Sequence, residues 1–340
     1  MLDINRILKS NRQMKALTGM NIIEFELLVP RIDDSISLKI LSKKVRKRKA
    51  GGGRKGVLNS MELKLFFILF YLKVYPTYDL ASAIFGVDKS RVCRWVKELL
   101  PILESTLERS YVLPKRKVQS LQDLFDSFPE TKDLFIDGTE RRINRPKQSK
   151  NQRNSYSGKQ KSHTRKNIVI CDEDRRIMYV SPTKNGKVHD FTQAKKELLF
   201  DNVPDKVCLW VDKGFQGIKN IVPPEQVEIP HKKPKGKSLS TEQKQENNVI
   251  SSFRIVIEHA IGGIKRFGCM AQKYRNHKGK DDQMIKLCAG LWNFHIQNSY
   301  LIEIITKLTK LCLTINFRFL FRNNSAVLLR ANDQSVTLEL

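Results

Sequence analysis

The chain has 340 residues, of which 62 are lysine or arginine and 35 are aspartate or glutamate, giving a formal charge of +27. A hydrophobic content of 40% can supply a core, which excludes wholesale disorder. So large a positive excess argues against an enzyme of small neutral metabolites and favours a polyanionic partner.

The length suggests about two domains, at ~150 residues each. The six cysteines are scattered without a CxxC pair, which indicates a reducing compartment and no cysteine-based zinc site. The apolar stretch Leu63–Val74 is too short to span a membrane, and Tyr300–Phe321 carries four charged residues. We therefore expect a soluble protein with no membrane partner.

The N-terminal segment, residues 1–58, shows weak helical periodicity and then a block of charge. Lys43–Lys55 holds eight basic residues, no acidic residue and three consecutive glycines. Such a block predicts a flexible cationic linker that contacts phosphates, although a merely solvated loop has the same composition.

Residues 59–110 are expected to be helical. Asn59 or Ser60 can cap a first helix whose apolar residues lie on one face, and Thr77 can cap a second over Tyr78–Phe85. After a break at Gly86, Lys89–Leu100 predicts a third helix that ends before Pro101. A short helix, a glycine turn and a longer basic helix are the layout of a helix-turn-helix.

The third helix of this segment carries the candidate DNA contacts. Ser90, Arg91, Arg94 and Lys97 share its outward side, where they would meet phosphates and base edges. An ordinary helical hairpin remains the alternative, and the net charge favours DNA.

From residue 130 to 300 the pattern changes to strands alternating with helices, which predicts an α/β fold with a mixed sheet flanked by helices. Continuous apolar runs indicate strands buried on both faces. The expected strands are Leu134–Asp137, His163–Cys171, Arg176–Ser181, Val207–Asp212 and Val227–Pro230. The expected helices are His189–Phe200, Ile250–Phe267 and further ones over Asp281–Lys307, with a polar loop over Lys232–Asn247.

Two of the predicted strands end in an acid, Asp137 and Asp212. The carboxyl ends of neighbouring strands form the crevice where ligands bind in such sheets. Two carboxylates placed there repel each other unless a cation lies between them, and oxygen ligands fit Mg²⁺ or Mn²⁺ rather than zinc. Solvated strand-terminal acids are the alternative.

A third acid is expected from the helix over Ile250–Phe267. Arg254, Glu258 and Lys265 share one stripe of this helix, so the stripe could bind a metal and hold a phosphate backbone. A surface ion-pair stripe would have the same spacing. Gly262 and Gly263 in mid-helix predict a close approach by another element.

Arg141–Lys166 contains ten basic residues and no acidic residue. Because this segment follows the first acidic strand, we expect it to line a DNA channel rather than to be merely solvated. The candidate contacts are Arg141, Arg142, Arg145, Lys159, Lys161 and His163.

Several motifs together resemble those of the DDE transposases. FIDGTE (Phe135–Glu140), LWVDKGFQG (Leu209–Gly217) and R-x3-E-x6-K (Arg254–Lys265) are similar to the three motifs of the bacterial insertion-sequence-five family and of related Harbinger-like DDE endonucleases. Four further segments are also similar: YSGKQKSHT (Tyr156–Thr164), NGKVHDF (Asn185–Phe191), PHKKPKGKSLS (Pro230–Ser240) and IEHAIGGIKRF (Ile257–Phe267). The chain departs from the family at Ser251, where a tyrosine is common.

The resemblance implies a ribonuclease-H-like domain over residues 130–300, preceded by the helix-turn-helix domain. It implies that Asp137, Asp212 and Glu258 hold two Mg²⁺ or Mn²⁺ ions, and that His189-Asp190 orients the site unless it merely caps a helix. The substrates would be double-stranded DNA ends and target DNA, cleaved and joined by a homo-oligomer in the bacterial cytoplasm.

Other readings stay open at this point. The tail over residues 301–340 resembles nothing, so a catalytically inactive or domesticated DNA-binding relative is the alternative. No glycine pattern of a nucleotide-binding loop is present, and no ATP dependence is expected.

Overall fold

The computed structural model describes residues 3–41, 56–118, 121–197, 199–201, 203–276 and 279–299. The cationic block Lys43–Lys55 and the tail after residue 300 lie outside these ranges. Met1–His295 forms one compact unit, to which the following description applies. None of the helices within the described ranges is long and apolar enough to cross a membrane.

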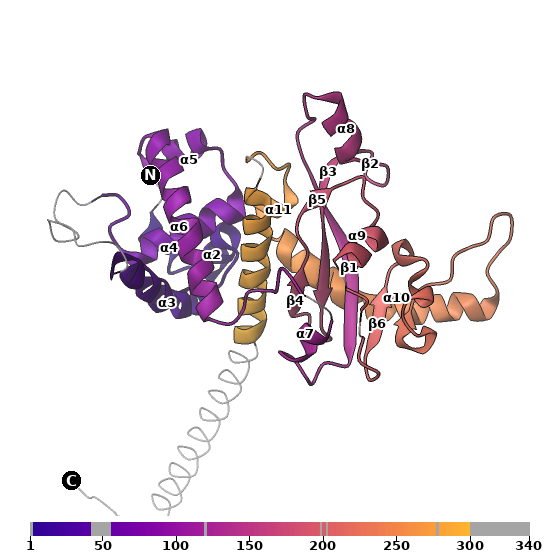
Figure 1. The fold of residues 1–340 in the computed structure, drawn as a ribbon. Helices are drawn as coiled ribbons and strands as arrows, with labels where there is room; N and C mark the ends of the chain where they lie inside the picture. The colour runs from indigo at the N-terminus through magenta and orange to yellow at the C-terminus, as the bar shows by residue number, and fades with distance from the viewer. Residues whose placement is uncertain are drawn as a thin grey trace, which may run out of the picture. The chain divides into compact units, whose positions relative to one another are not determined.

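The N-terminal part of this unit is helical (Figure 1). Its helices are α1 (Ile4–Ile7), α2 (Asn11–Thr18), α3 (Ile22–Leu41), α4 (Met61–Val74), α5 (Tyr78–Phe85) and α6 (Lys89–Arg109). The side chain of Ser60 caps α4 and that of Thr77 caps α5, while Gly86 ends α5 in the left-handed conformation. These three residues confirm the predicted helix boundaries.

Two predictions about these helices are wrong. The apolar residues of α4 are buried from Leu65 to Leu72 instead of on one face, because α2, α3, α6 and α11 surround the helix. Helix α6 continues through Pro101 for two further turns, to Arg109. Pro101 lacks an N–H and strains the preceding turn, but Ile102, Leu103 and Leu107 are buried beyond it. Their burial offsets that cost.

The C-terminal part is built on a mixed sheet. Its strands are β1 (Asp133–Arg142), β2 (Tyr156–Ser157), β3 (Ser162–Cys171), β4 (Ile177–Val180), β5 (Lys184–Asn185), β6 (Cys208–Val211) and β7 (Val227–Glu228). The order β2-β3-β1-β6-β7 places β1 at the centre, and β4 and β5 pair with β3. Strand β1 is antiparallel to β3 and parallel to β6.

Helices and short turns flank this sheet (Figure 1). The helices are α7 (Gln122–Phe125), α8 (Ser149–Ser155), α9 (Asp190–Lys196), α10 (Thr241–Lys265) and α11 (Gly268–Ala271), and residues 280–295 of the same unit are also helical. Three turns of 3-10 helix cover Lys213–Phe215, Ile218–Asn220 and Pro224–Gln226.

The two faces of β1 have different roles. Leu134 and Ile136 point into a hydrophobic core that includes residues of α7 and α9. Residues of the other parity face α10, which packs against β1, β3 and β6. On that side the ring of Phe135 stacks on Trp210 at 5.9 Å. Asp137 has the same parity as Phe135 and therefore faces α10.

Three further boundaries differ from the predictions. Strand β1 does not end at Asp137 but runs on to Arg142, because its pairing with β3 continues to Arg142↔Thr164. Helix α10 begins at Thr241, inside the predicted polar loop, because Ser240 and Gln243 form a capping box. Helix α9 ends at Lys196, shorter than predicted.

Candidate active site

The strand register brings the first two acids together. Ile136 pairs with Val211 at the end of the parallel β1–β6 ladder, so Asp137 and Asp212 are the next residue on each strand. Strand β6 ends there, while β1 continues past it. The predicted juxtaposition therefore arises at the end of the parallel ladder rather than at the end of both strands.

Arg254 of α10 contacts both carboxylates. Its Nη1 lies 3.2 Å from Oδ1 of Asp212, and its Nη2 lies 3.6 Å from Oδ2 of Asp137. Only 11% of the Arg254 side chain is exposed. The guanidinium thus supplies the positive charge that two neighbouring carboxylates require.

Burial raises the pKa of Asp137 to about 6, against the opposing effects of Arg254 and of a hydrogen bond from the Gly138 N–H. That N–H donates to Oδ1 of Asp137 at 2.7 Å. The charge of Asp212 raises the pKa further. Asp137 therefore lies in an environment that disfavours an uncompensated negative charge.

Glu258, the predicted third acid, does not join this pair. It lies one helical turn after Arg254 on α10, but its side chain is exposed and makes no ion pair with any residue in the described ranges. Within those ranges no group of three His, Cys, Asp or Glu side chains is arranged to hold a metal ion. The two aspartates alone offer the oxygen ligands that Mg²⁺ or Mn²⁺ prefers, with Arg254 between them.

Lys265 lies further along α10, near β1. Desolvation lowers its pKa, while attraction to Asp137 and Glu140 opposes that shift. The predicted stripe of Arg254 and Lys265 therefore faces the acidic end of β1. Of the two glycines between them, Gly263 is approached closely by Trp292, whereas Gly262 has open space around it.

A buried ion-pair network supports β1 from the opposite face. Lys166 Nζ lies 3.2 Å from Glu140 and 3.0 Å from Asp190, and all three side chains are largely buried. A side chain at Gly138 would collide with the Asp190 carboxylate. Asp190 thus packs against the residue that follows Asp137. The pairing of Lys166 with these acids was missed from the sequence, where Lys166 is one of a run of cations.

The cations of the Arg141–Lys166 segment separate into two groups. Arg141 is 4% exposed, with its guanidinium 4.4 Å from the ring centre of Tyr274. The prediction that Arg141 lines a DNA channel is therefore wrong. Arg141 alternates with its neighbours so that its side chain lies on the same face of β1 as Asp137, where α11 covers it. Arg142, Arg145, Lys159 and Lys161 are exposed, and His163 is partly exposed.

On the helix-turn-helix, the predicted outward residues are on the surface. Ser90, Arg91, Arg94 and Lys97 are all exposed on α6, while Val92 and Val96 between them are fully buried. The two valines fix which side of α6 faces solvent. On α5, Ala81 and Phe85 are buried, and the ring of Phe85 packs edge-on against Phe67 at 5.2 Å.

Comparisons with known proteins agree with this arrangement. The sequence model of the family described as "DDE superfamily endonuclease" matches residues 136–293, and that described as "Helix-turn-helix of DDE superfamily endonuclease" matches residues 57–109. The chain is 31% identical over 286 residues to the "Probable transposase for insertion sequence element IS702" of Microchaete diplosiphon. This match covers 84% of the chain and 95% of the relative.

The chain belongs to the DDE-superfamily transposases. These matches confirm the predicted DDE superfamily and the helix-turn-helix that precedes its catalytic domain. The mixed sheet with its flanking helices is consistent with the predicted ribonuclease-H-like fold. No solved structure matches the transposase. Membership of the superfamily implies nuclease chemistry that depends on a divalent metal.

Proposed function

We propose that this transposase cleaves double-stranded DNA at the ends of its element and joins the freed ends to target DNA. The observation that supports this most directly is the pair Asp137 and Asp212, placed side by side by the parallel β1–β6 register and bridged by a cation. We also place the transposase in the insertion-sequence-five group, on the motifs FIDGTE, LWVDKGFQG and R-x3-E-x6-K.

The proposed ligands are Asp137, Asp212 and Glu258, which would hold two Mg²⁺ or Mn²⁺ ions. When bound, such ions would supply activation of an attacking water or 3′-hydroxyl and stabilisation of the leaving oxygen in an in-line displacement. Glu258 would have to turn toward the aspartates, and Arg254 would have to release them. Arg254 and Lys265 are then available to the phosphate backbone from the same side of the site.

The other residues of the site keep the carboxylates in place. The Gly138 N–H holds one oxygen of Asp137 at 2.7 Å. The ion pairs of Lys166 with Glu140 and Asp190 hold β1 in place on the face opposite to α10. No side chain is required as a covalent nucleophile, because water or a DNA hydroxyl performs the attack.

Two exposed cationic groups would bind the DNA. One is the outward side of α6, with Arg91, Arg94 and Lys97. The other follows the first acidic strand, with Arg142, Arg145, Lys159, Lys161 and His163. We infer that the transposase binds element ends as a homo-oligomer, because joining two ends to one target requires two active sites near each other.

The test is cleavage of a plasmid that carries the gene's native flanking DNA, with and without Mg²⁺. Wild-type protein should cut at the flank boundaries, and Asp137→Asn, Asp212→Asn and Glu258→Gln should each lose cleavage while still binding the DNA. Retained cleavage by one variant would remove that residue from the proposed ligand set.

A catalytically inactive DNA-binding relative is the other candidate function. It predicts metal-independent binding to the flanks and no cleavage by the wild-type protein. The presence of all three acids within the matched endonuclease region favours the active enzyme.

A further inference from the structure

The segment between β7 and α10, residues 231–240, is a basic loop that the proposed DNA-binding groups do not include. We call it the lysine loop. All four of its lysines are exposed, and none of them pairs with an acid among the residues that the structure describes. The lysines are Lys232, Lys233, Lys235 and Lys237. So dense a group of unpaired cations favours contact with a polyanion.

Both ends of the lysine loop are attached to α10. At its start, the His231 N–H donates to Oδ1 of Asn247 at 2.6 Å, and Nδ2 of Asn247 donates to the His231 carbonyl at 3.3 Å. At its end, the side chain of Ser240 caps α10. Between these two points, residues 234–237 form a hydrogen-bonded turn in which Gly236 has a φ of +77°. A merely solvated loop needs no such attachments, so the lysines are presented in a defined arrangement.

The lysine loop starts at the edge of the sheet that carries Asp137 and Asp212. Strand β7 is parallel to β6, and Trp210 pairs with Glu228. Asp212 and Pro230 each lie two residues after this pair. Because neighbouring strands lie ~4.8 Å apart, the loop begins beside Asp212 and leads away from it.

Helix α10 gives the distance of the lysine loop from the acids. Asn247 and Ser240 lie seven and fourteen residues before Arg254, which contacts both carboxylates. At ~1.5 Å per residue, these separations correspond to about 10 and 21 Å along the helix. A duplex that follows α10 advances by ~3.4 Å per base pair, so the loop would meet phosphates about three to six base pairs from the cleavage position.

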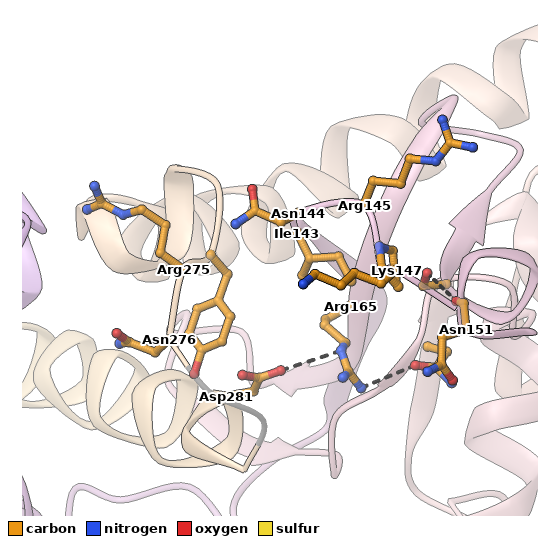
Figure 2. A pocket seen from close by; sticks show the side chains of 13 residues that line it. Ile143, Asn144, Arg145, Lys147, Asn151, Arg165, Arg275, Asn276 and Asp281 are labelled. Atoms are coloured by element: carbon orange, nitrogen blue, oxygen red, sulfur yellow. Dashed lines mark hydrogen bonds and ion pairs between the residues drawn. The ribbon is translucent and has the colours of Figure 1, made fainter. Parts of the chain in front are cut away.

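The other proposed DNA contacts lie on the opposite side of the acids. The second cationic group follows β1 and includes residues between β2 and β3, at the other end of the strand order from β7. Figure 2 shows one of its members, Arg145, extending away from the Arg165–Asp281 ion pair. The helix-turn-helix adjoins the C-terminal end of α10, where Lys73 Nζ donates to the Arg266 carbonyl at 2.7 Å. The lysine loop lies at the N-terminal end of that helix (Figure 1).

We propose that the lysine loop binds the phosphate backbone of the flanking duplex, the DNA that continues beyond the element end. The helix-turn-helix holds the element end near one end of α10, and the flank leaves the active site toward the other end. Flanks differ in sequence from one insertion to the next. Lysine suits such DNA, because it binds phosphate as a point charge and reads no base there. This inference rests on the proposed function and adds to it a binding site for DNA outside the element.

The experiment measures binding of the full-length protein to three duplexes in EDTA, where no cleavage occurs, by fluorescence anisotropy. The first duplex carries an element end with its native flank, the second carries the same end with a flank of unrelated sequence, and the third stops at the element boundary. The loop variant combines Lys232→Gln, Lys233→Gln, Lys235→Gln and Lys237→Gln. It should lose affinity for both flanked duplexes and bind the third as the wild type does.

The salt dependence gives the size of the effect. Each phosphate contact that is lost lowers the slope of log affinity against log salt by about 0.9. For about two to four lost contacts, the wild-type affinity for a flanked duplex should fall roughly 10- to 150-fold more than that of the loop variant between 50 and 200 mM salt.

A matched control separates the lysine loop from net charge. Replacing Lys132, Lys195, Lys196 and Lys206 by glutamine removes the same charge from exposed positions before β1 and β6 and on α9. This control should bind all three duplexes as the wild type does, and circular dichroism checks that both variants are folded. Single uncharged methylphosphonate linkages in the flank test the position on the wild-type protein alone. They should weaken binding about three to six base pairs beyond the boundary.

The inference is overturned if the loop variant keeps the wild-type affinity and salt slope on the flanked duplexes, if it loses as much affinity for the duplex without a flank, or if the control loses as much. Its failure is separable from failure of the proposed function, which is read from Mg²⁺-dependent cleavage by the wild-type protein. Cleavage by the wild type together with an unchanged salt slope in the loop variant would refute the lysine loop alone. Loop-dependent binding of the flank without cleavage would refute only the proposed reaction.

Discussion

Replacement of Arg254 by methionine tests the electrostatics of the carboxylate pair. The guanidinium contacts Asp137 at 3.6 Å and Asp212 at 3.2 Å. Methionine keeps much of the length of the side chain and removes the charge. The two carboxylates then face each other without a cation between them.

The contribution of Asp137 to the pH dependence of stability follows from its pKa. Burial raises it from 3.8 to about 6, which corresponds to about 3 kcal/mol at ~1.4 kcal/mol per pH unit. The carboxyl group of Asp137 binds a proton more tightly in the folded protein than in the unfolded chain. Protonation of Asp137 therefore stabilises the folded state fully below about pH 4. This stabilisation is lost as the pH rises through about 6. Above that range Asp137 destabilises the folded protein.

A neighbouring arginine lowers the pKa of an aspartate by about 1–3 pH units. In Arg254→Met we therefore expect the titration of Asp137 to move upward by that amount. Relative to wild type, the variant should lose about 1.3–2.6 kcal/mol more stability between pH 5 and pH 8, because its folded state keeps a proton on Asp137 that the unfolded chain releases. This difference saturates, because an Asp137 with a pKa above 8 stays protonated at both pH values.

Urea denaturation in EDTA at the two pH values measures this difference. Asp137→Asn in the Arg254→Met background should remove most of the difference in unfolding free energy between pH 5 and pH 8. The control Arg94→Met, on the exposed side of α6, should change the unfolding free energy equally at both pH values. An equal loss of stability at pH 5 and pH 8, or no rescue by Asp137→Asn, would refute the argument.

Three further predictions concern packing, the buried network and DNA binding. Gly263→Ala should destabilise the folded protein by about 1–3 kcal/mol because its Cβ would overlap Trp292. Gly262→Ala has open space around it, so it should be neutral or stabilising by up to ~1 kcal/mol. Urea denaturation of the two variants compares these effects. Lys166→Met should cost about 3–5 kcal/mol in the same assay, since it leaves two buried carboxylates unpaired, and a cost below 1 kcal/mol would contradict the network. Arg91→Gln should lower the slope of log affinity against log salt by about 0.9 if Arg91 contacts a phosphate, and an unchanged slope would exclude that contact.

Local features of the sequence were enough to predict many of the elements. The caps Ser60 and Thr77 and the turn at Gly86 act through hydrogen bonds and backbone conformations within a few residues, so their effect can be read without the fold. The acids Asp137 and Asp212 were found in the same way, because each directly follows a short apolar run. The exposed side of α6 follows from helical periodicity alone.

Tertiary structure decided which of these residues meet. The adjacency of Asp137 and Asp212 depends on the β1–β6 register, and the continuation of β1 past Asp137 depends on β3. Arg141 looks like a surface cation in the sequence, but strand parity places it under Tyr274. Arg254 and Glu258 have the same periodicity on α10, yet only Arg254 reaches the acids. A linear pattern specifies the side of an element on which a residue lies, whereas contacts with other elements depend on how those elements pack in three dimensions.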